Sequence, residues 1–398
     1  MKLDEFKEDI YKCSGCGLCQ SVCPVYKILK KESAVSRGKF KLLNAIVNKD
    51  IKFSKKTLEF MDMCLHCQAC SEFCPSGIDA QKIIETAQYD MLGCGIFNFP
   101  KIAVAQIFSR KIYLNLIKFF IRVLRITKVL DILCCFNFKK IKLLQAFLKI
   151  NIPKIRQKSD KTKTIRALYF KGCINNYINP SVQNAVEKVL DKTEVEVIEA
   201  PFYCCGLPMK SAGDFESFIE VAKKNIDAIS DIEFDYLIFD CASCKSTFLS
   251  YVQFLQDEYK EKAQNIVLKA IGIYELLKII DYKPSKKLSK INVTCHYPCH
   301  TRFSNDKKIM AGLIKKIPNV EFVQMQDADS CCGAAGSFMF AQSSLSKQIS
   351  AKKAENIIET DAQVVLTACP ACFLGLKQGL LEKNNNTQVM QLVEFLAQ

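Results

Sequence analysis

The second half of the chain alternates short apolar runs with amphipathic stretches, and the alternation occurs twice. Apolar runs separated by segments of helical periodicity are typical of a parallel sheet with crossover helices. We therefore expect two α/β domains, a first over residues 163–285 and a second over residues 286–398, related by a pseudo-twofold axis. The predicted strands lie at 167–170, 194–203 and 236–240 in the first copy, and at 291–296, 320–325 and 363–368 in the second.

Residues 1–92 lack this alternation. Between residues 25 and 63 the apolar side chains recur at helical spacing, as in the run from Leu42 to Val47. We expect a mainly helical N-terminal domain over residues 1–92.

In residues 93–162 apolar and basic residues alternate in short groups, which predicts a helical linker. No apolar run reaches about 18 residues, so a membrane-spanning helix is not expected. Two interpretations remain: helices packed on the protein's own core with Lys and Arg outward, or a basic amphipathic surface on anionic lipid. From Lys101 to Lys158 there are fourteen basic residues and one acid, Asp131, which gives +13 of the net charge of +15.

Two cysteine runs in the N-terminal domain carry the strongest chemical signal. Both have the spacing C-x2-C-x2-C-x3-C-P. This spacing holds two [4Fe–4S] clusters in bacterial-type ferredoxins, and the fourth Cys of each run ligates the other run's cluster. A zinc ribbon needs only two C-x2-C pairs, so zinc is not expected here. The predicted ligands are Cys13, Cys16, Cys19 and Cys74 for one cluster, and Cys64, Cys67, Cys70 and Cys23 for the other.

Each α/β copy carries five cysteines in the same order. The five matching pairs of cysteines are 126, 127, 127, 128 and 128 residues apart, which indicates a duplication. Each group follows a predicted strand, so the groups should meet at the carboxyl edge of the sheet, where open α/β sheets bind ligands. The cysteines are Cys173, Cys204, Cys205, Cys241 and Cys244 in the first copy, and Cys299, Cys331, Cys332, Cys369 and Cys372 in the second.

Five thiolates exceed the four that one zinc ion or one cubane cluster requires. We therefore expect an unusual iron–sulfur cluster in one or both copies, with zinc in one copy as the main alternative and a purely structural cysteine cluster as another. Gly206 and Gly333 follow the adjacent cysteines and should have a positive φ or a close backbone approach.

Composition narrows the function classes. The chain has 398 residues, 22 Cys, three His and no Trp. Cysteines in C-x2-C groups, without an apolar N-terminal signal, indicate metal in a reducing cytosol rather than disulfides. No nucleic-acid-binding motif accompanies the basic segment, so nucleic acid is not an expected partner. No G-x-G-x-x-G or P-loop motif is present, so we expect no flavin or NAD on this chain.

Several other residues have two interpretations each. Arg37 is either a cation that raises the potential of a nearby cluster or a solvated side chain at a turn. Cys295 is either a spare ligand of the second copy or, as we predict, a packed core thiol. His296 and His300 either contact the cluster or only pack. Cys94, Cys134 and Cys135 have no ligand spacing, and we predict that they are buried.

The complete pattern resembles the iron–sulfur subunits of glycolate oxidase, lactate utilisation and anaerobic glycerol-3-phosphate dehydrogenase. In that family a two-cluster ferredoxin module precedes two cysteine-rich CCG domains, a pair also found in heterodisulfide reductase. MDMCLHCQACSEFCPSGI, at 61–78, is similar to the glycolate oxidase type, and GCINNYINP, at 172–180, to the glycerol-3-phosphate type. A departure is Tyr297, where the family commonly has an acid.

The resemblance implies a mainly helical two-[4Fe–4S] domain followed by a duplicated CCG pair with parallel sheets. The expected fold class is α+β for the whole chain, in which the CCG pair is α/β. It also implies that the five cysteines of each copy hold a non-cubane [4Fe–4S] cluster. The implied function is electron transfer from an FAD-containing dehydrogenase subunit to quinone, with glycolate, lactate or glycerol 3-phosphate as the partner's substrate.

No residue of this chain is then expected to be catalytic, because the hydride-transfer site would lie on the partner. The expected location is the cytoplasm, with a peripheral contact on the inner face of the cell membrane if the basic segment binds lipid. The alternative is a heterodisulfide-reductase-like enzyme whose CCG clusters reduce a disulfide. Metal storage is a weaker third hypothesis, because the ferredoxin spacing suits redox chemistry.

Overall fold

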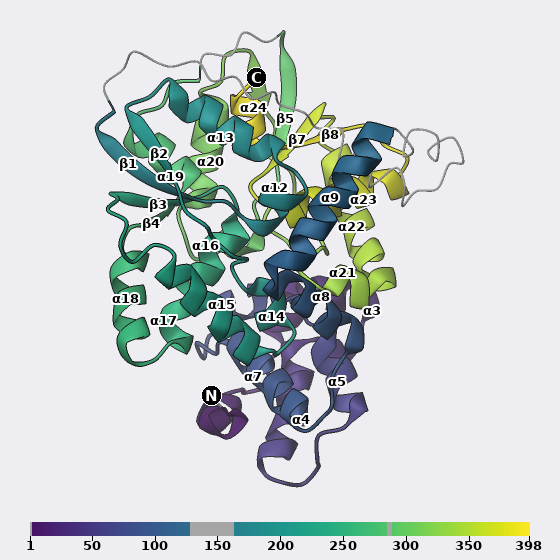
Figure 1. Cartoon of the computed structure of the whole chain (residues 1–398). Coiled ribbons are helices and arrows are strands. Elements are labelled where there is room, and N and C mark those ends of the chain that lie inside the picture. Colours follow the sequence, from purple (N-terminus) through teal and green to yellow (C-terminus); the bar gives the residue numbers. More distant parts are fainter. Residues whose placement is uncertain (1, 128–162, 285–288) are drawn as a thin grey trace.

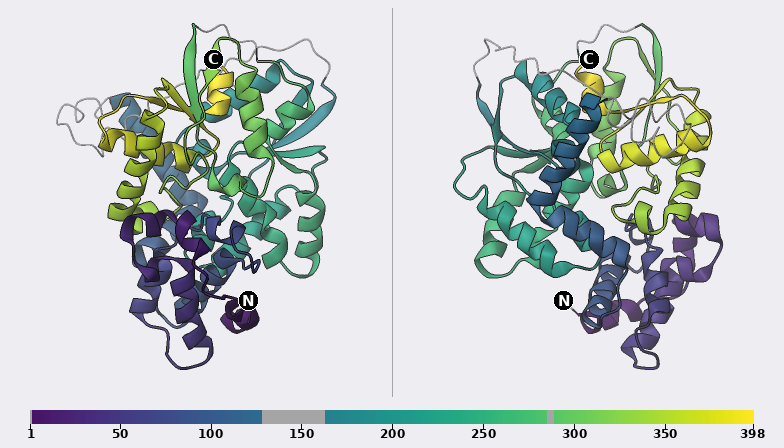
Figure 2. Two further views of the ribbon diagram at one scale, coloured as in Figure 1. Left: turned by 180° about the vertical axis from the view of Figure 1, so that it is seen from behind. Right: turned by 45° about the vertical axis from the view of Figure 1, so that its right-hand side comes forward.

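The structure, a computed structural model, describes residues 2–127, 163–284 and 289–398. A helical N-terminal domain lies below two α/β halves (Figure 1). The view from behind shows the same arrangement (Figure 2). The expected fold class is therefore confirmed. Cys134, Cys135 and the basic residues beyond residue 127 lie outside the described part of the chain.

The N-terminal domain consists of short helices that begin and end at the cysteine loops. Its elements are η1 Leu3–Phe6, α1 Lys7–Tyr11, α2 Leu18–Val22, α3 Pro24–Leu29, η2 Glu32–Ala34, α4 Ser36–Val47, α5 Lys55–Asp62, α6 Ala69–Glu72 and α7 Ala80–Gly93. Pro24 follows Cys23 directly and begins α3, where its missing N–H leaves no unmade helical bond. Gly17, with a φ of 85°, caps α2 in the left-handed conformation that suits glycine. The predicted helical character of residues 25–63 is confirmed.

The first α/β half is a four-stranded parallel sheet with the strand order β2-β1-β3-β4. Its strands are β1 Ile165–Phe170, β2 Val195–Glu199, β3 Tyr236–Phe239 and β4 Ala270–Gly272. Its helices are α12 Cys173–Tyr177, α13 Ser181–Asp191, α14 Leu207–Ser211, α15 Phe215–Asp227, α16 Ala242–Leu249, α17 Tyr251–Phe254, α18 Asp257–Val267 and α19 Ile273–Ile279. Consecutive residues of β1, from Ala167 to Phe170, are all buried, so both faces of the sheet are covered.

The second half repeats this topology with the strand order β6-β5-β7-β8. Its strands are β5 Ile291–Cys295, β6 Val320–Phe322, β7 Val364–Thr367 and β8 Gln388–Gln391. Its helices are η3 Cys299–Thr301, α20 Asp306–Lys315, α21 Phe338–Ala341, α22 Ser343–Ile358, α23 Pro370–Glu382 and α24 Leu392–Leu396. The six predicted strands are all present. The fourth strand of each sheet was missed, because β4 has three residues and β8 has only two apolar residues among its four.

The two sheets face each other through their carboxyl edges. The Sγ atoms of Cys241 and Cys369, equivalent residues of the two copies, are 4.0 Å apart. A contact between equivalent residues must lie on the symmetry axis, which confirms the pseudo-twofold arrangement. The N–H of Ala242 also donates to the carbonyl of Ala368 at 2.9 Å. The symmetric bond is not possible, because Pro370 stands in the equivalent position and has no N–H.

The halves also exchange contacts at the far end of the chain. Glu394, in α24 of the second half, accepts a 2.6 Å hydrogen bond from Oγ of Ser181 in the first half. The N–H of Val393 donates to the hydroxyl of Tyr274 at 3.2 Å. Buried residues of both halves form one continuous hydrophobic core. The pair is therefore one packed unit.

Buried ions join the N-terminal domain to the rest. Helices α8 Phe99–Ser109 and α9 Lys111–Thr127 follow that domain and contribute Ala105 and Leu114 to the α/β core. At the start of α8, Nζ of Lys101 lies 2.8 Å from Oδ1 of Asp62, and both side chains are buried. Breaking a buried pair leaves an uncompensated charge, so this contact specifies how α8 lies against the domain.

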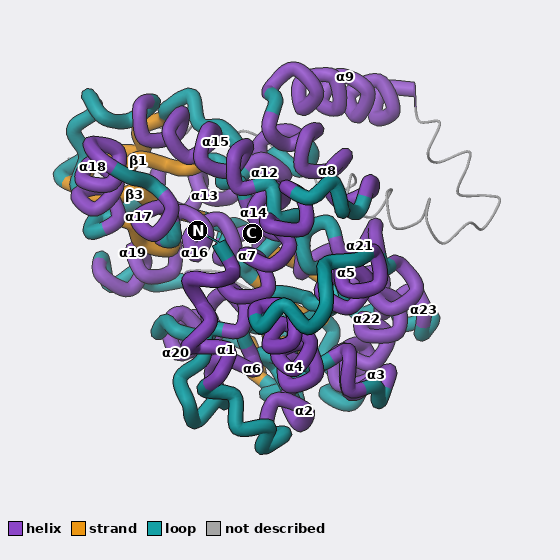
Figure 3. The backbone as a smooth tube through the Cα atoms, turned by 90° about the horizontal axis from the view of Figure 1, so that it is seen from below, coloured by secondary structure: helices purple, strands orange, loops and turns teal. Residues whose placement is uncertain are grey.

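Helix α9 lies at the periphery of the molecule (Figure 3). It follows the core-packing interpretation in part, because Leu114 is buried in the core while Lys118 and Arg122 are exposed. Two features depart from it: Nζ of Lys111 lies 3.6 Å from the ring centroid of Tyr203, and Phe119 and Phe120 are more than 60% exposed. Within the described ranges, no helix has both the length and the apolar character needed to span a bilayer.

The adjacent-cysteine turns generate a stability prediction. Gly206 and Gly333 have φ of 91° and 85°, as predicted. A Cβ on Gly206 would lie 2.5 Å from Cδ2 of Phe218. Gly206→Ala should therefore lower the free energy of unfolding by about 2–4 kcal/mol, through left-handed strain and overpacking.

The control is Gly312→Ala, in α20, where the added Cβ meets open space. Alanine should stabilise that exposed helical position by about 0.5–1 kcal/mol. Denaturant unfolding followed by circular dichroism measures both variants. Equal midpoints for the two would contradict the expected strain at Gly206.

Candidate iron–sulfur sites

The eight N-terminal cysteines line two small neighbouring cavities. The first cavity is lined by Cys13, Cys16, Cys19 and Cys74, the second by Cys23, Cys64 and Cys67, and Cys70 lines both. The structure thus brings together the two groups of four that the ferredoxin spacing predicts, each with a cysteine from the other run. Cys16 is exposed, so the first cavity is the one nearer solvent.

Backbone amides point at two of these thiols. The N–H of Tyr26 lies 3.5 Å from Sγ of Cys23, and the N–H of His66 lies 3.4 Å from Sγ of Cys64. Such N–H···S contacts stabilise negative charge on sulfur and tune the potential of a bound cluster.

A buried lysine lies beside the second cavity. Lys39, on α4, is 2% exposed and lines that cavity. Its Nζ donates to the carbonyls of Ser33 and Ala34 at 3.3 and 2.5 Å. Burial lowers the pKa of Lys39, and the thiol groups of Cys64 and Cys23 oppose this effect. A cation held at this depth stabilises negative charge on its neighbours.

Arg37 lies on the same helix and contacts the loop of the first cavity. Its Nη1 donates to the carbonyl of Gly15 at 3.0 Å, and its Nε lies 2.5 Å from Oε1 of Glu32. Arg37 is therefore part of the wall of this cavity rather than a free side chain at a turn. Glu32 balances much of its charge.

The ten cysteines of the α/β halves are buried at the carboxyl edges of the two sheets. Cys173 follows β1, Cys204 and Cys205 follow β2, and Cys241 and Cys244 follow β3. The Sγ atoms of Cys204 and Cys173 are 3.4 Å apart. The second half repeats this placement, with Cys299 after β5, Cys331 and Cys332 after β6, and Cys369 and Cys372 after β7.

All ten thiols line one cavity of about 190 Å³ between the sheets. Apolar side chains of α8, α12, α21 and α23 complete the wall, among them Phe108, Ile174, Met339 and Leu374. No Lys, Arg, Asp or Glu is among the described residues that line it. Such a site favours a metal centre bound by thiolates and an apolar ligand next to it.

The donor chemistry fits iron–sulfur clusters. The hydrogen bonds that the Cys204 thiol makes with Cys173 and Cys205, followed by burial, raise its pKa well above its usual value. Burial likewise raises the pKa of Cys67. Buried thiols in such groups do not ionise together without a cation, which bound iron supplies. A Cβ at Gly172 would lie 3.2 Å from Sγ of Cys244, so glycine keeps this space open.

The two halves complete each other's sites. Ser243, between the last two cysteines of the first half, has its Oγ 3.2 Å from Sγ of Cys369 in the second half. The same Oγ lies 3.0 Å from Nδ1 of His300, and that nitrogen is 3.8 Å from Sγ of Cys299. His300 therefore contacts thiols of the second half, one of its two expected roles.

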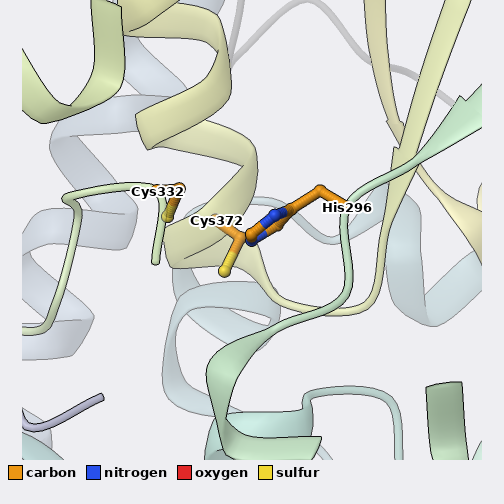
Figure 4. Close-up of side chains that lie close together, drawn as sticks. All are labelled: His296, Cys332 and Cys372. Carbon is orange, nitrogen blue, oxygen red and sulfur yellow. The ribbon is translucent and has the colours of Figure 1, made fainter. Parts of the chain in front are cut away.

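His296 is oriented toward the second group of thiols. It follows β5 and is fully buried. Its ring points toward Cys332 and Cys372, and the three donor atoms lie within 4.8 Å of one another (Figure 4).

The N-terminal domain brings one of its cavities next to the second half. Cys299 and Cys331 belong to a small buried cluster with Val25 and Leu65, against which Cys23 and Cys67 pack. The series of thiol groups therefore continues from the N-terminal domain into the α/β pair.

Of the cysteines outside these groups, Cys295 and Cys94 lie in the described residues and differ in burial. Cys295 is fully buried in the core, as predicted, and burial raises its pKa. Cys94 was predicted to be buried and this is wrong, because it is exposed just after α7. Its position beyond the last helical turn leaves it without neighbours to cover it.

Sequence reasoning missed Lys39 and Ser243. Lys39 lies on a helix that also carries Lys41, and only the packing of α4 against the cysteine loops shows which lysine is buried. Ser243 had a local signal, since it lies inside a C-x2-C pair. Its contact with Cys369 spans 126 residues and depends on how the halves meet.

Two family models match the chain. The model described as a cysteine-rich domain (CCG) matches residues 167–249 and 293–377. The model described as a 4Fe-4S dicluster domain matches residues 9–78.

Three similar proteins extend these matches. A probable glycolate oxidase iron–sulfur subunit of Bacillus subtilis is 26% identical over 95% of this chain and 91% of its own length. Lactate utilization protein A of Bacillus pumilus is 30% identical over 57% of this chain and 97% of its own length. A component of the dihydromethanophenazine:CoB–CoM heterodisulfide reductase of Methanosarcina acetivorans is 24% identical over 98% of this chain and 94% of its own length. The chain therefore belongs to the family of iron–sulfur subunits, with glycolate oxidase and lactate utilization members, in which a 4Fe-4S dicluster domain precedes paired cysteine-rich CCG domains.

Proposed function

We propose that this chain transfers electrons from a flavin-containing dehydrogenase subunit to quinone. The partner would carry FAD and oxidise glycolate, lactate or glycerol 3-phosphate. The observation that supports this most is the series of thiol groups from exposed Cys16, through the cluster that holds Cys299 and against which Cys67 packs, to the apolar cavity between the sheets.

The cysteines would hold the clusters in four groups. Bound clusters would supply one-electron transfer, which a flavin partner requires after it has taken two electrons from its substrate. Zinc in one α/β half remains the alternative to a fourth cluster. The proposed groups are Cys13, Cys16, Cys19 and Cys74; Cys64, Cys67, Cys70 and Cys23; Cys173, Cys204, Cys205, Cys241 and Cys244; and Cys299, Cys331, Cys332, Cys369 and Cys372.

The partner would dock near the first N-terminal cavity. Leu18, which lines it, is half exposed, and so is Phe73, which precedes Cys74. An apolar rim around exposed Cys16 suits a protein interface, since buried apolar side chains supply the core of such interfaces. Electrons would then have a short path from the partner to the thiol groups.

Quinone would bind at the other end, in the cavity between the sheets. Its wall is largely apolar, and one of its few polar groups is the ring of buried His66: Nδ1 lies 3.5 Å from Oε1 of Glu85, while Nε2 makes no hydrogen bond within the described structure. A largely apolar cavity with one convergent donor suits a lipophilic ring that carries a carbonyl group.

Helix α9 would bring this cavity to the lipid surface. It packs beside α8 and α12, which line the cavity, and it exposes Ile112, Phe119 and Phe120. The segment from Lys101 to Lys158, to which this helix belongs, has a net charge of +13, which favours contact with anionic lipid. We therefore propose that the protein works on the cytoplasmic face of the cell membrane, bound peripherally.

Disulfide reduction is the second candidate. It is favoured by the common cavity, because ten thiols surround a space that a small disulfide could enter. The lining argues against disulfides with charged substituents, because no Lys or Arg among its described residues would neutralise them.

The proposed electron transfer through the clusters, here called the relay, can be tested with Cys70→Ser. This residue carries the thiol that lines both N-terminal cavities. In the complex with its flavoprotein, electron transfer from substrate to quinone should be lost, while flavin reduction by substrate continues. Stopped-flow absorbance of the flavin and of the quinone separates the two steps. Cys94→Ser, at an exposed cysteine outside the sites, is the control. Quinone reduction at the full rate by Cys70→Ser would disprove the relay.

The buried cation supplies a second test. Lys39→Met keeps the length of the side chain and removes its charge beside the second N-terminal cavity. The midpoint potential there should fall by roughly 100 mV, since a unit charge about 6 Å away at an effective dielectric constant of about 20 contributes about 2–3 kcal/mol. Potentiometric EPR measures the change. Lys41→Met, at an exposed position of the same helix, should leave the potential unchanged.

The membrane contact can be tested by flotation. The wild-type protein should float with vesicles that contain phosphatidylglycerol at low salt. Replacing Phe119 and Phe120 together by Ser should weaken binding by at least about tenfold, because each inserted phenylalanine contributes about 1.5–3 kcal/mol. Leu268→Ser, at another exposed apolar position, should have no effect. Wild-type protein that stays with the unbound fraction would remove the membrane proposal.

A further inference from the structure

The two α/β halves repeat their cysteines but not the residues around them. In the alignment that matches Cys173 with Cys299, His296 corresponds to Phe170. Phe170 packs among aromatic rings, at 4.5 Å from Phe202 and 5.0 Å from Phe239 between ring centroids. The second half therefore has a nitrogen donor where the first half has a hydrocarbon ring.

The position of His296 is well defined. Its backbone N–H donates to the carbonyl of Leu366 at 2.8 Å, which continues the pairing of β5 with β7 beyond the strand. Its ring nitrogens and the thiols of Cys332 and Cys372 lie within 4.8 Å of one another. These thiols come from the other two cysteine loops, so three chain segments converge on one point.

The imidazole has no alternative partner. It is 0% exposed, and neither Nδ1 nor Nε2 makes a hydrogen bond within the described structure. Leaving a buried polar group without a partner costs about 1–3 kcal/mol. Histidine is the commonest nitrogen ligand of metals in proteins, so a metal next to the two thiolates would satisfy the ring.

The charged residues next to the cysteines also differ between the two halves. Asp240, buried next to Cys241 of the first half, corresponds to Ala368 in the second. The second half has a buried lysine, Lys353, on α22, the helix whose Ser350 donates to the carbonyl of Cys332 at 2.9 Å. The first site also has a buried ammonium group, Lys245 next to Cys244, but this is paired with Glu275 and Asp306. The first site thus has an acid beside Cys241, where the second has no acid and gains an imidazole.

We propose that His296 is a further ligand of the metal centre in the second half, which gives this site a mixed thiolate–imidazole donor set. The inference rests on the proposed function, in which the second group of five cysteines holds an iron–sulfur cluster. Where the imidazole occupies a position on iron that a thiolate holds in the first half, the neutral donor in place of an anionic one raises the potential of the centre. The second centre then has a higher potential than the first, although both have the same five cysteines.

The test uses the small number of histidines. The full chain, which has only His66, His296 and His300, is prepared anaerobically with ¹⁵N-labelled histidine. Pulsed EPR then measures nitrogen hyperfine coupling to the paramagnetic clusters. We expect a strong coupling that changes with the isotope and is lost in His296→Phe, the residue that occupies the equivalent position of the first half. The midpoint potential of the same centre should fall in that variant.

His300→Gln is the matched control, because this second buried histidine also lies beside thiols of the second half. It should retain the strong coupling. If His296→Phe does not fold, His296→Asn and the labelled wild-type protein give the same information. Iron-loaded protein without a strong histidine coupling would overturn the ligand and leave the proposed function intact. An iron content that is unchanged by Cys332→Ser would overturn both, because the second half would then hold no cluster.

Discussion

The carboxyl edges of the two parallel sheets face each other, and every site in the α/β pair depends on this contact. Strands of one direction end at one edge, so the loops that carry cysteines are gathered there in each half. The contact of Cys241 with Cys369 then places both groups on a common cavity. Because the two halves have one continuous core, neither site is formed by its own half alone.

The N-terminal domain is held in register with this pair by three ion pairs, two of them buried. Lys101 pairs with Asp62, Lys210 lies 3.6 Å from Glu85, and Arg302 pairs with Glu72. Desolvation offsets much of the energy of such pairs, so their main effect is geometric. The pair of Arg302 with Glu72 holds α6, with its cysteine loop, against the second half. Cys67 then packs against the buried cluster that contains Cys299, and this cluster connects the two cysteine systems.

Duplication explains the architecture, and the departures from it explain why the two sites are not equivalent. Both halves have the same strand order and the same five cysteine positions. Pro370 removes one of two symmetric hydrogen bonds at the axis, and His296 and Phe170 give the sites different neighbours. Two identical centres would leave an electron with no preference between them, whereas different surroundings separate their potentials.

The sequence by itself determined the elements and the chemistry. Cysteine spacing predicted two groups of four in the N-terminal domain, the constant offset predicted two equivalent α/β domains, and Gly206 and Gly333 predicted left-handed turns. These features are local or periodic, so they can be recognised in one segment at a time. The tertiary structure alone decided which lysine is buried, which face of α9 is exposed, and that Ser243 reaches Cys369. These contacts join residues far apart in the chain, and their formation depends on packing that no local pattern contains.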